Sequence, residues 1–382
     1  MYPRISDLLL DLFGIDLSLP IQTFGFFVAI GFVAANYFFS LELKRKQERG
    51  EVWPLTIKHY KKVENGFMPY VFPVIIGGFL GYKFLYFILD WSGFAALPHK
   101  YILSLEGNFL GAVLGIVFSI YNKNKEMKEE AAKPDVYEET VYPYQLVGNM
   151  TLIAALFGII GAKIFHNLEN MNEFWRDPIE ALISFSGLTI YGGLIVGSLA
   201  VVYYTKKKGI PTLHVIDACA PGLMLAYGIG RIGCHMSGDG DWGIENLAAN
   251  PFSFLPDWMW SYSYPHNVIS EGVLIPGCVG EHCYQLANPV YPTAFYEAIV
   301  SILIFGVLWS LRKKIKYAGQ MFAVYLMFNG AERFAIESIR VNTKYNILGG
   351  VTQAQIISTI FFLFGVFGFF YLNKLNQKKH GA

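Results

Sequence analysis

The chain is short of charged residues, and the charges that it has nearly cancel. Only 15% of its 382 residues are charged, and the formal net charge is +1. Its basic residues occur in short scattered runs, so nothing favours a nucleic-acid partner. The first 20 residues lack a basic start and contain three aspartates, a composition that is not typical of a cleavable signal. Insertion into a membrane would then depend on later segments.

Cysteine is also scarce, with four residues in the chain. Cys278 and Cys283 are separated by four residues in a polar segment, which allows a disulfide if that segment faces an oxidising compartment. Cys234 begins a cluster of metal-ligand residue types, but its C-H-x3-D-x-D spacing matches no zinc site that we can defend. We therefore expect no metal ion and no other cofactor.

Apolar sequence, by contrast, is abundant. Hydrophobic residues make up 54% of the chain and aromatic residues 16%, and the mean hydropathy is +0.38. The apolar residues form repeated blocks of about 20, the length that a helix needs to cross about 30 Å of hydrocarbon. This pattern predicts an all-α polytopic membrane protein. About nine transmembrane helices are expected, at 21–40, 68–90, 103–121, 145–166, 187–204, 213–233, 293–311, 318–337 and 354–373.

The distribution of lysine and arginine predicts the orientation of these helices. Alternate connecting segments hold 21 of these residues, and the segments between them hold only 5. Because cytoplasmic loops carry the excess of basic residues, we expect the amino terminus outside and the carboxy terminus inside. Four more lie within predicted spans, where a charge is costly and a functional or paired role is the default. They are Lys83, Lys163, Arg231 and Arg333.

Three further segments bear on the organisation of the chain. Gly78 to Lys83 resembles Gly158 to Lys163, which indicates either an internal duplication or glycines that let helices pack closely in lipid. Residues 122–143 are predicted to be a solvated connector. The segment 234–292 has no lysine or arginine and is rich in tryptophan and tyrosine, so we expect a small periplasmic subdomain near the lipid–water interface.

The first candidate for chemistry is the glycine-rich stretch around Arg231. Its G-x-G-R-x-G pattern follows no strand, so a dinucleotide site is excluded by its context. An arginine at headgroup level among glycines can bind a phosphate through a forked pair of hydrogen bonds. A snorkelling arginine at a helix end explains the pattern equally well.

The second candidate is formed by Arg333, Glu337 and Arg340, whose spacing places them on one face of a helix. We expect Glu337 to neutralise Arg333 and Arg340 to stay free near the surface. An ion pair that only tethers two helices is the alternative.

The third candidate, Ser184 to Leu194, contains Tyr191, which could donate to a headgroup or a leaving oxygen, or could be an interfacial anchor. His235 is a candidate base or hydrogen-bond donor. Asp217 and Glu297 are acids at membrane depth, for which pairing with Lys83, with Lys163 or with backbone groups is the simplest role.

Several of these stretches together resemble the prolipoprotein diacylglyceryl transferase family of the bacterial inner membrane. Gly230 to Asp239 is similar to the family signature G-R-x-G-N-F-x-N-x-E, and Arg333 to Arg340 follows R-x-x-x-E-x-x-R. Three other segments match family motifs in the same order, namely Ser186 to Leu194 (S-F-H-G-G-L), Asp217 to Pro221 (D-x-x-A-P) and Tyr291 to Glu297 (H-P-S-Q-L-Y-E). The first span with Thr23 to Gly25 resembles the family's amino-terminal helix.

This chain departs from the family pattern at several positions. Tyr191 stands where the family has a histidine, Cys234 and Ser237 replace the asparagines of the signature, Asp239 replaces its glutamate, and Phe24 replaces the amino-terminal tyrosine. These replacements keep two alternatives open. One is an enzyme of the same fold that transfers a different lipid or headgroup, and the other is a non-enzymatic phospholipid-binding or transport protein.

The resemblance implies a domain organisation. The family core has seven spans, so the pair at 68–121 looks like an insertion. We expect an amino-terminal span and cytoplasmic loop at 1–67, an inserted pair and cytoplasmic connector at 68–144, a transferase-like core at 145–373 and a cytoplasmic tail at 374–382.

The resemblance also implies a reaction. In this family the cysteine thiol of a lipoprotein precursor attacks the diacylglyceryl carbon of phosphatidylglycerol, and glycerol phosphate leaves at the periplasmic face. The expected partners are phosphatidylglycerol, the signal peptide of the precursor and membrane lipid, with no nucleic acid. The expected catalytic residues are Arg231, Arg333, His235 and Tyr191. The expected substrate-binding residues are Glu337, Arg340, Asp239, Gly192, Gly193, Asp217 and Glu297.

Overall fold

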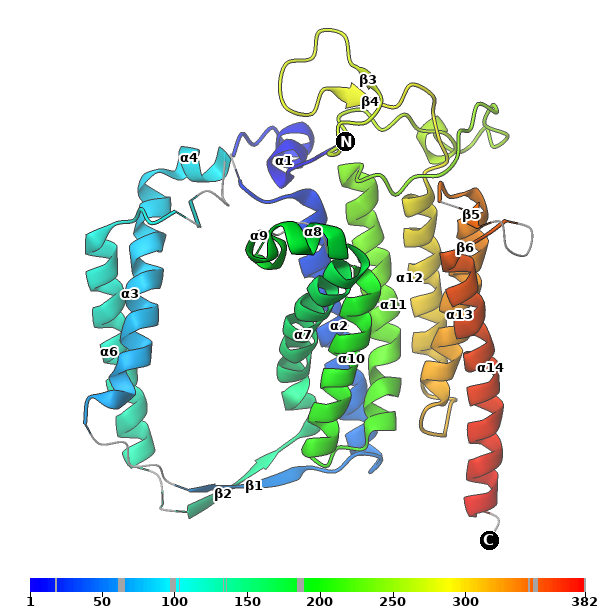
Figure 1. Ribbon diagram of the computed structural model, residues 1–382. Coiled ribbons are helices and arrows are strands. Elements are labelled where there is room, and N and C mark those ends of the chain that lie inside the picture. The colour runs from blue at the N-terminus through cyan, green and yellow to red at the C-terminus, as the bar shows by residue number, and fades with distance from the viewer. Residues whose placement is uncertain are drawn as a thin grey trace. The chain divides into compact units, whose positions relative to one another are not determined.

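The computed structural model is mostly helical (Figure 1). It describes residues 1–17, 19–60, 66–96, 101–102, 104–132, 134, 136–183, 189–342, 344–345 and 350–380. The chain separates into two compact units. The larger comprises Met1, Thr23–Leu55 and Val141–Ala382, and the smaller comprises Tyr2–Gln22 and Thr56–Thr140. Part of the third candidate segment, residues 184–188, lies outside the described residues.

The larger unit contains the long helices of the predicted core. Its helices are α2 (Thr23–Glu48), α7 (Val147–Glu169), α8 (Met171–Arg176), α9 (Pro178–Ile183), α10 (Ile190–Lys207), α11 (Thr212–Ser237), α12 (Thr293–Leu311), α13 (Gln320–Ile336) and α14 (Gln353–His380). Short 3-10 turns are η1 (Pro143–Leu146), η2 (Asp257–Met259) and η3 (Glu337–Ile339). Two small antiparallel hairpins pair β3 (Val273–Leu274) with β4 (Tyr284–Gln285) and β5 (Lys344–Tyr345) with β6 (Val351–Thr352).

The smaller unit contains α1 (Ile5–Phe13), α3 (Met68–Leu89), α4 (Trp91–Ala96) and α6 (Phe109–Ala131). Strand β1 (Leu55–Tyr60) pairs with β2 (Val136–Val141). The segment 122–143, predicted to be a solvated connector, is mostly exposed where it is described, and it contains the end of α6 and strand β2. Its alternating charges form ion pairs one turn apart, such as Lys123 with Glu126 at 3.2 Å, and these extend α6 beyond its apolar part.

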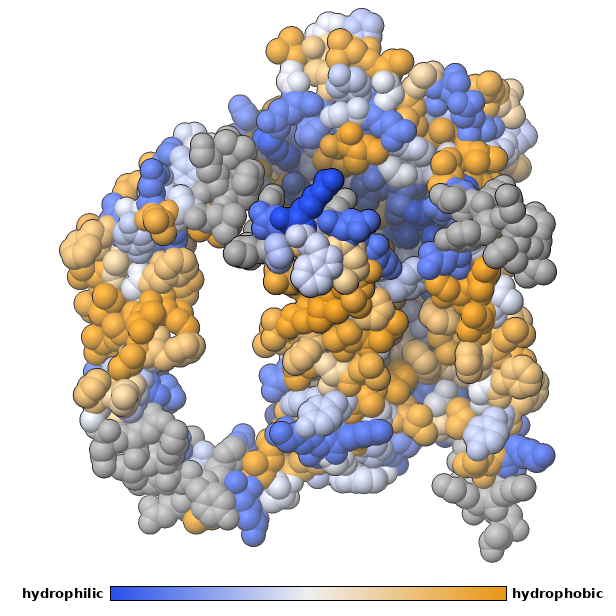
Figure 2. Space-filling view, viewed as in Figure 1, coloured by the Kyte–Doolittle hydropathy of each residue, from blue (hydrophilic) through white to orange (hydrophobic). Residues whose placement is uncertain are grey.

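Among the described residues, six helices are long and apolar enough to cross a membrane, which agrees with a polytopic membrane protein. They are α2, α3, α7 with the preceding η1, α11, α12 and α14. Figure 2 shows hydrophobic residues along the middle of the helices and hydrophilic residues toward their ends. The other three predicted spans coincide with α6, α10 and α13, which are helices with charged residues in their last turns. That these three also cross the membrane stays a prediction.

Helix α11 packs against α2 on one side and α12 on the other. Small residues allow the close approach to α2, since a Cβ added at Gly31 would lie 3.1 Å from the carbonyl oxygen of Ala226. Toward α12 and α13 the contact is a buried apolar cluster that includes Met224, Leu308 and Met321. These contacts fix the ends of α11, α12 and α13 relative to one another, which determines the geometry of the site described below.

Two helical hairpins share one contact pattern, in agreement with the echo between Gly78–Lys83 and Gly158–Lys163. In the smaller unit, Asn108 at the start of α6 donates its backbone N–H to Tyr82 of α3. In the larger unit, Thr189 at the start of α10 donates in the same way to Ala162 of α7. Tyr82 and Ala162 each directly precede the lysine of the echo.

The helix contacts of the two hairpins match as well. An added Cβ at Gly81 would lie 2.2 Å from the carbonyl oxygen of Gly111, and one at Gly161 would lie 2.4 Å from that of Gly192. After each first helix, Asp90 and Asn170 cap the C-terminus and begin a short helix. The repetition of these contacts favours a duplication of one hairpin, beyond the small residues that close packing alone requires.

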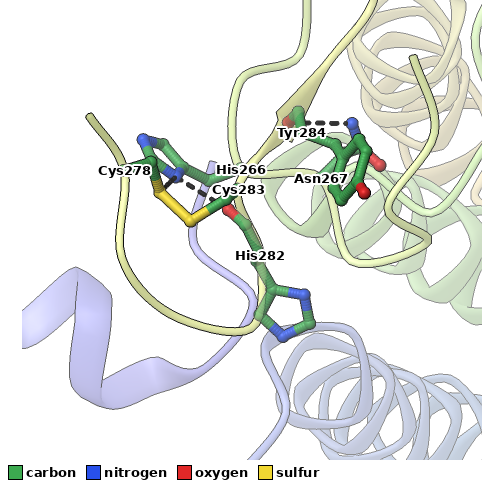
Figure 3. Close-up of a disulfide and its surroundings, with 6 residues drawn as sticks. All are labelled: His266, Asn267, Cys278, His282, Cys283 and Tyr284. Atoms are coloured by element: carbon green, nitrogen blue, oxygen red, sulfur yellow. Dashed lines mark hydrogen bonds between the residues drawn. A yellow bond between two sulfur atoms is a disulfide. The ribbon is translucent and has the colours of Figure 1, made fainter. Parts of the chain in front are cut away.

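The segment after α11 forms its own small core, in which Trp242, Tyr264, Leu286 and Val290 are buried. Its β3–β4 hairpin is closed by a disulfide between Cys278 and Cys283, as the spacing of the two residues allowed (Figure 3). The fully buried Asn267 braces the base of the hairpin by donating to backbone carbonyls of Tyr264, Glu271 and Tyr284.

Close contact between α7 and α10 makes a prediction about Gly192. Replacing it with alanine would place a Cβ 2.4 Å from the Gly161 carbonyl oxygen, so the helices must separate. We expect the Gly192→Ala variant to lose about 1–3 kcal/mol of unfolding free energy, seen as a lower melting temperature in detergent. Gly148→Ala in α7 is the control, because its added Cβ would meet nothing within 4 Å in the described structure outside its chain neighbours and the adjacent backbone of its own helix. Equal melting temperatures for the two variants would contradict the contact.

A second prediction concerns Glu51, which follows α2. Burial acts to raise the pKa of Glu51, but a hydrogen bond from Lys46 and the charges of Lys46, His214 and Arg45 outweigh it and hold the pKa below its usual range. A depressed carboxyl pKa stabilises the fold above the unfolded-state pKa, and this contribution is lost as pH falls through the folded-state value. Wild type should therefore melt above Glu51→Gln at pH 7.

The difference between wild type and Glu51→Gln should shrink in acid, below about pH 4.3. Thermal unfolding across pH measures it. Glu138→Gln is the control, because Glu138 is exposed in its pair with Lys58. A difference that persists unchanged at low pH would show that Glu51 acts through packing rather than charge.

Candidate active site

The candidate site is centred on the carboxylate of Glu297, on the first turns of α12. Its side chain is fully buried, and it binds arginines from three different segments. Arg231 of α11 reaches Oε2 with its Nε at 2.5 Å, and Arg333 of α13 reaches Oε1 at 2.9 Å. Arg340 also contacts Oε1, at 3.2 Å. The two arginines expected to bind phosphate therefore meet on one carboxylate.

Two further acids complete the set of ion pairs, which we call the arginine cluster: Arg231, Arg333, Arg340, Asp241, Glu297 and Glu337. Asp241 bridges Arg231 and Arg340 with its two carboxylate oxygens. Glu337 pairs with Arg333 at 3.3 Å, as its spacing predicted. Three guanidinium groups thus face three carboxylates, and the cluster is formally neutral. Such balance is what allows these charges to be buried at the end of a membrane helix.

The loop after α11 positions Asp241 and Arg340. Gly238 ends the helix in the left-handed conformation with φ of 65°, and the chain then turns back across the helix ends. Thr293 donates its hydroxyl to the Asp241 carbonyl oxygen at 2.9 Å. Gly243 forms an antiparallel bridge with Arg340, and an added Cβ there would lie 2.6 Å from the Ile339 carbonyl oxygen. A glycine is therefore required where the loop contacts the segment that carries Arg340.

The expectation that Arg340 stays free near the surface is wrong. Helix α13 ends at Ile336 and continues as the 3-10 turn η3, after which Arg340 adopts an extended backbone. This change of backbone turns Arg340 toward Glu297 and Asp241, and only 10% of its side chain is exposed. Helical spacing could not predict this, because Glu337 and Arg340 no longer belong to one α-helical face.

Glu297 and Asp217 also differ in role from the simplest expectation. Glu297 binds the three arginines, so pairing with Lys83 or Lys163 is wrong as its main role. Asp217 accepts hydrogen bonds from the backbone N–H groups of Gly319 and Phe322 at the start of α13.

This bonding confirms for Asp217 the alternative of pairing with backbone groups. Asp217 precedes Arg231 by 14 residues on α11, about 21 Å along the helix axis. Its contacts are those of a residue that orients α13, at a distance from the cluster.

Other expected site residues lie in different surroundings. The His235 ring is enclosed by aromatic rings, and its Nδ1 lies 3.1 Å from the Tyr264 hydroxyl. Gly192 and Gly193 pack against α7. Among the described residues, no hydrogen bond or ion pair joins Tyr191 to the arginine cluster. The structure therefore brings together five of the expected site residues, namely Arg231, Arg333, Arg340, Glu337 and Glu297. His235, Gly192, Gly193 and Tyr191 are not part of this cluster.

Asp239 lies at the edge of the cluster, beside Asp241 and Cys234. One potential ligand atom of each of these three residues lies within 4.8 Å of the others. Burial and the negative charge of Asp241 raise the pKa of Asp239. Asp241 is already bound by two guanidinium groups, so positive charge is present without a metal ion. The sequence did not predict that Asp241 bridges two arginines. Its position in the C-H-x3-D-x-D pattern indicated only a metal-ligand residue type.

The sequence of the chain is similar to those of known proteins. The family model for prolipoprotein diacylglyceryl transferase matches residues 110–371, more than half of the chain. The chain belongs to this family. It is therefore a transferase, and with its apolar helices it is a multi-pass bacterial membrane protein. The match contains every member of the arginine cluster and leaves out α2 and α3.

Several curated relatives share the name phosphatidylglycerol–prolipoprotein diacylglyceryl transferase. The protein of Corynebacterium glutamicum is 29% identical over 267 residues, which cover 69% of this chain and 77% of that protein. The protein of Clostridioides difficile is 30% identical over 70% of this chain and 89% of its own length. That of Streptococcus pyogenes is 26% identical over 72% and 93%.

The position of Glu297 at the centre of the cluster makes a prediction about stability. Replacing it with glutamine leaves three buried guanidinium groups with two carboxylates, so we expect a loss of about 3–5 kcal/mol in unfolding free energy. Thermal or denaturant unfolding of the purified protein in detergent measures it. Glu138→Gln, whose pair with Lys58 is exposed, should change stability by less than about 1 kcal/mol. A loss for Glu297→Gln no larger than for this control would contradict the central role of Glu297.

Proposed function

We propose that this protein transfers the diacylglyceryl group of phosphatidylglycerol to the cysteine thiol of a lipoprotein precursor. The observation that carries the proposal is the meeting of Arg231 and Arg333 on the buried carboxylate of Glu297. The names of the relatives support the same substrates. The altered signature leaves the cluster intact, because none of the replaced positions is one of its six members.

The reaction explains why arginines are needed. The sulfur of the precursor cysteine forms a bond to the glyceryl carbon, and the bond from that carbon to a phosphate oxygen breaks. The bonding electron pair goes to the phosphate oxygen, so negative charge grows on the departing glycerol phosphate. Prearranged cations at this position stabilise the transition state most. Each guanidinium has five N–H donors, and the carboxylates of the cluster occupy only some of them.

Roles within the cluster follow from its contacts. Arg231 and Arg333 bind the phosphate of the lipid. Arg340, Glu337, Glu297 and Asp241 hold the two arginines in place. We propose that Asp239, beside Asp241, contacts the headgroup. We assign no chemical step to His235 or Tyr191, because no hydrogen bond or ion pair between described residues joins either of them to the cluster.

The proposed site faces the outside of the bacterial inner membrane. The excess of lysine and arginine in alternate segments supports an outer amino terminus and an inner carboxy terminus. The disulfide between Cys278 and Cys283 fits an oxidising compartment, and it closes a hairpin in the loop that leads from Arg231 to α12. In this orientation the cluster is reached by phosphatidylglycerol in the outer leaflet and by a precursor held in the membrane by its signal peptide.

Activity of arginine variants tests the proposal. The purified full chain in detergent, with phosphatidylglycerol and a cysteine-containing precursor peptide, should form a thioether-linked diacylglyceryl peptide. We expect Arg231→Ala and Arg333→Ala each to lower kcat by about 10²-fold or more, measured by mass spectrometry of the peptide. Arg49→Ala is the matched control, because Arg49 is an exposed arginine at the opposite end of the helices from the cluster. Absence of product with the folded wild type would overturn the proposed function.

A further inference from the structure

A cavity between α12 and α13 adjoins the arginine cluster. It has a volume of about 200 Å³ and is lined by Tyr296, Glu297, Val300, Glu332, Ala335 and Ile336. Residues of α13 that are three and four apart share a helix face, so Glu332, Ala335 and Ile336 form one wall. Glu297 belongs to the opposite wall. The carboxylate that binds the three arginines is therefore also part of the cavity lining.

Glu332 is the acid in this cavity whose carboxylate forms no hydrogen bond within the described part of the chain. Its residue is 8% exposed, and within the described part of the chain neither carboxylate oxygen has a hydrogen bond. Glu297 and Glu337, by contrast, are held by arginines. Burying a carboxyl group without a hydrogen-bond partner is costly, so a native protein that keeps one requires a reason for it.

The roles assigned above leave open which residue accepts the thiol proton. A thiol becomes a strong nucleophile only as the thiolate, and an adjacent base is the usual means of producing it. His235 lies among aromatic rings, and Asp239 accepts the backbone N–H of Asp241. Asp241, Glu297 and Glu337 are engaged by guanidinium groups. Glu332 alone among these groups offers two carboxylate oxygens that are not already engaged.

We propose that Glu332 accepts the proton of the precursor cysteine thiol. The proposal rests on the function proposed above. The S–H bond breaks, and the proton goes to a carboxylate oxygen of Glu332. The sulfur electron pair then forms the bond to the glyceryl carbon as the bond from carbon to phosphate oxygen breaks. The proton is afterwards passed to the departing phosphate oxygen, which restores the carboxylate. No other reactant is required.

The charges around Glu332 suit this role. Glu297 lines the same cavity as Glu332, and Arg333 follows Glu332 directly on α13. The ionisable groups that face it are Glu297, Arg231, Arg333 and Arg340, together with Tyr227, Tyr325 and Tyr296. When phosphate binds, its negative charge interacts with the same arginines. The acid can then release its proton to the departing group.

The pH dependence of Glu332→Gln tests this role. At pH 6.5, with saturating phosphatidylglycerol, we expect kcat to be about 10²-fold below wild type. The deficit should shrink to a few-fold by pH 9, because a thiol with a pKa near 8.5 is then ionised by solvent. The KM for phosphatidylglycerol should not change. Glu332→Asp, which keeps a carboxylate, should recover part of the rate at pH 6.5.

The controls separate this inference from the proposed function. Glu129→Gln on α6 is the matched control, because Glu129 is an exposed acid that pairs with the exposed Lys125. Thermal unfolding shows whether Glu332→Gln is folded. A deficit that is the same at every pH, a changed KM with unchanged kcat, or wild-type rates at pH 6.5 would each overturn the role of Glu332 while the transferase activity stands. A wild type that forms no thioether would overturn both.

Discussion

The pairing of one buried carboxylate with three guanidinium groups is the constraint on which the rest of the site depends. Glu297 is removed from solvent, and an isolated charge in that position would be strongly unfavourable. Because its arginines come from α11, from α13 and from the segment after η3, the carboxylate fixes the relative positions of all three. The packing of α2 and α12 against α11 serves to bring these partners to the same end of the helices.

The sequence predicted the helices well, because a run of about 20 apolar residues leaves the backbone little alternative in lipid. It predicted their polar ends less well. The charges after residue 121 predicted a solvated connector. In the structure, charges of this segment form ion pairs along the last turns of α6. The spacing of Cys278 and Cys283, with four intervening residues in a polar segment, allowed the disulfide that the structure contains.

The sequence predicted only those residues of the candidate site whose roles follow from local sequence. Arg231 and Arg333 stand out because charges in apolar runs require an explanation, and Glu337 follows from helical spacing. Arg340 and Asp241 do not, because they are 99 residues apart and meet only where a loop bridge brings their backbones together. Glu332 was hidden beside Arg333, since its isolation becomes visible only when the partners of every neighbouring acid are known.

The arrangement of charges also constrains how the chain is made. Arg231 leaves the ribosome first, and Asp241 follows ten residues later, so their pair can form before α12 is complete. Glu297 and Arg333 lie on consecutive helices, and burying either charge in a membrane without its partner costs about 3 kcal/mol. Inserted together as a helical hairpin, they neutralise each other. The order of residues along the chain therefore places these charges near the partners that neutralise them.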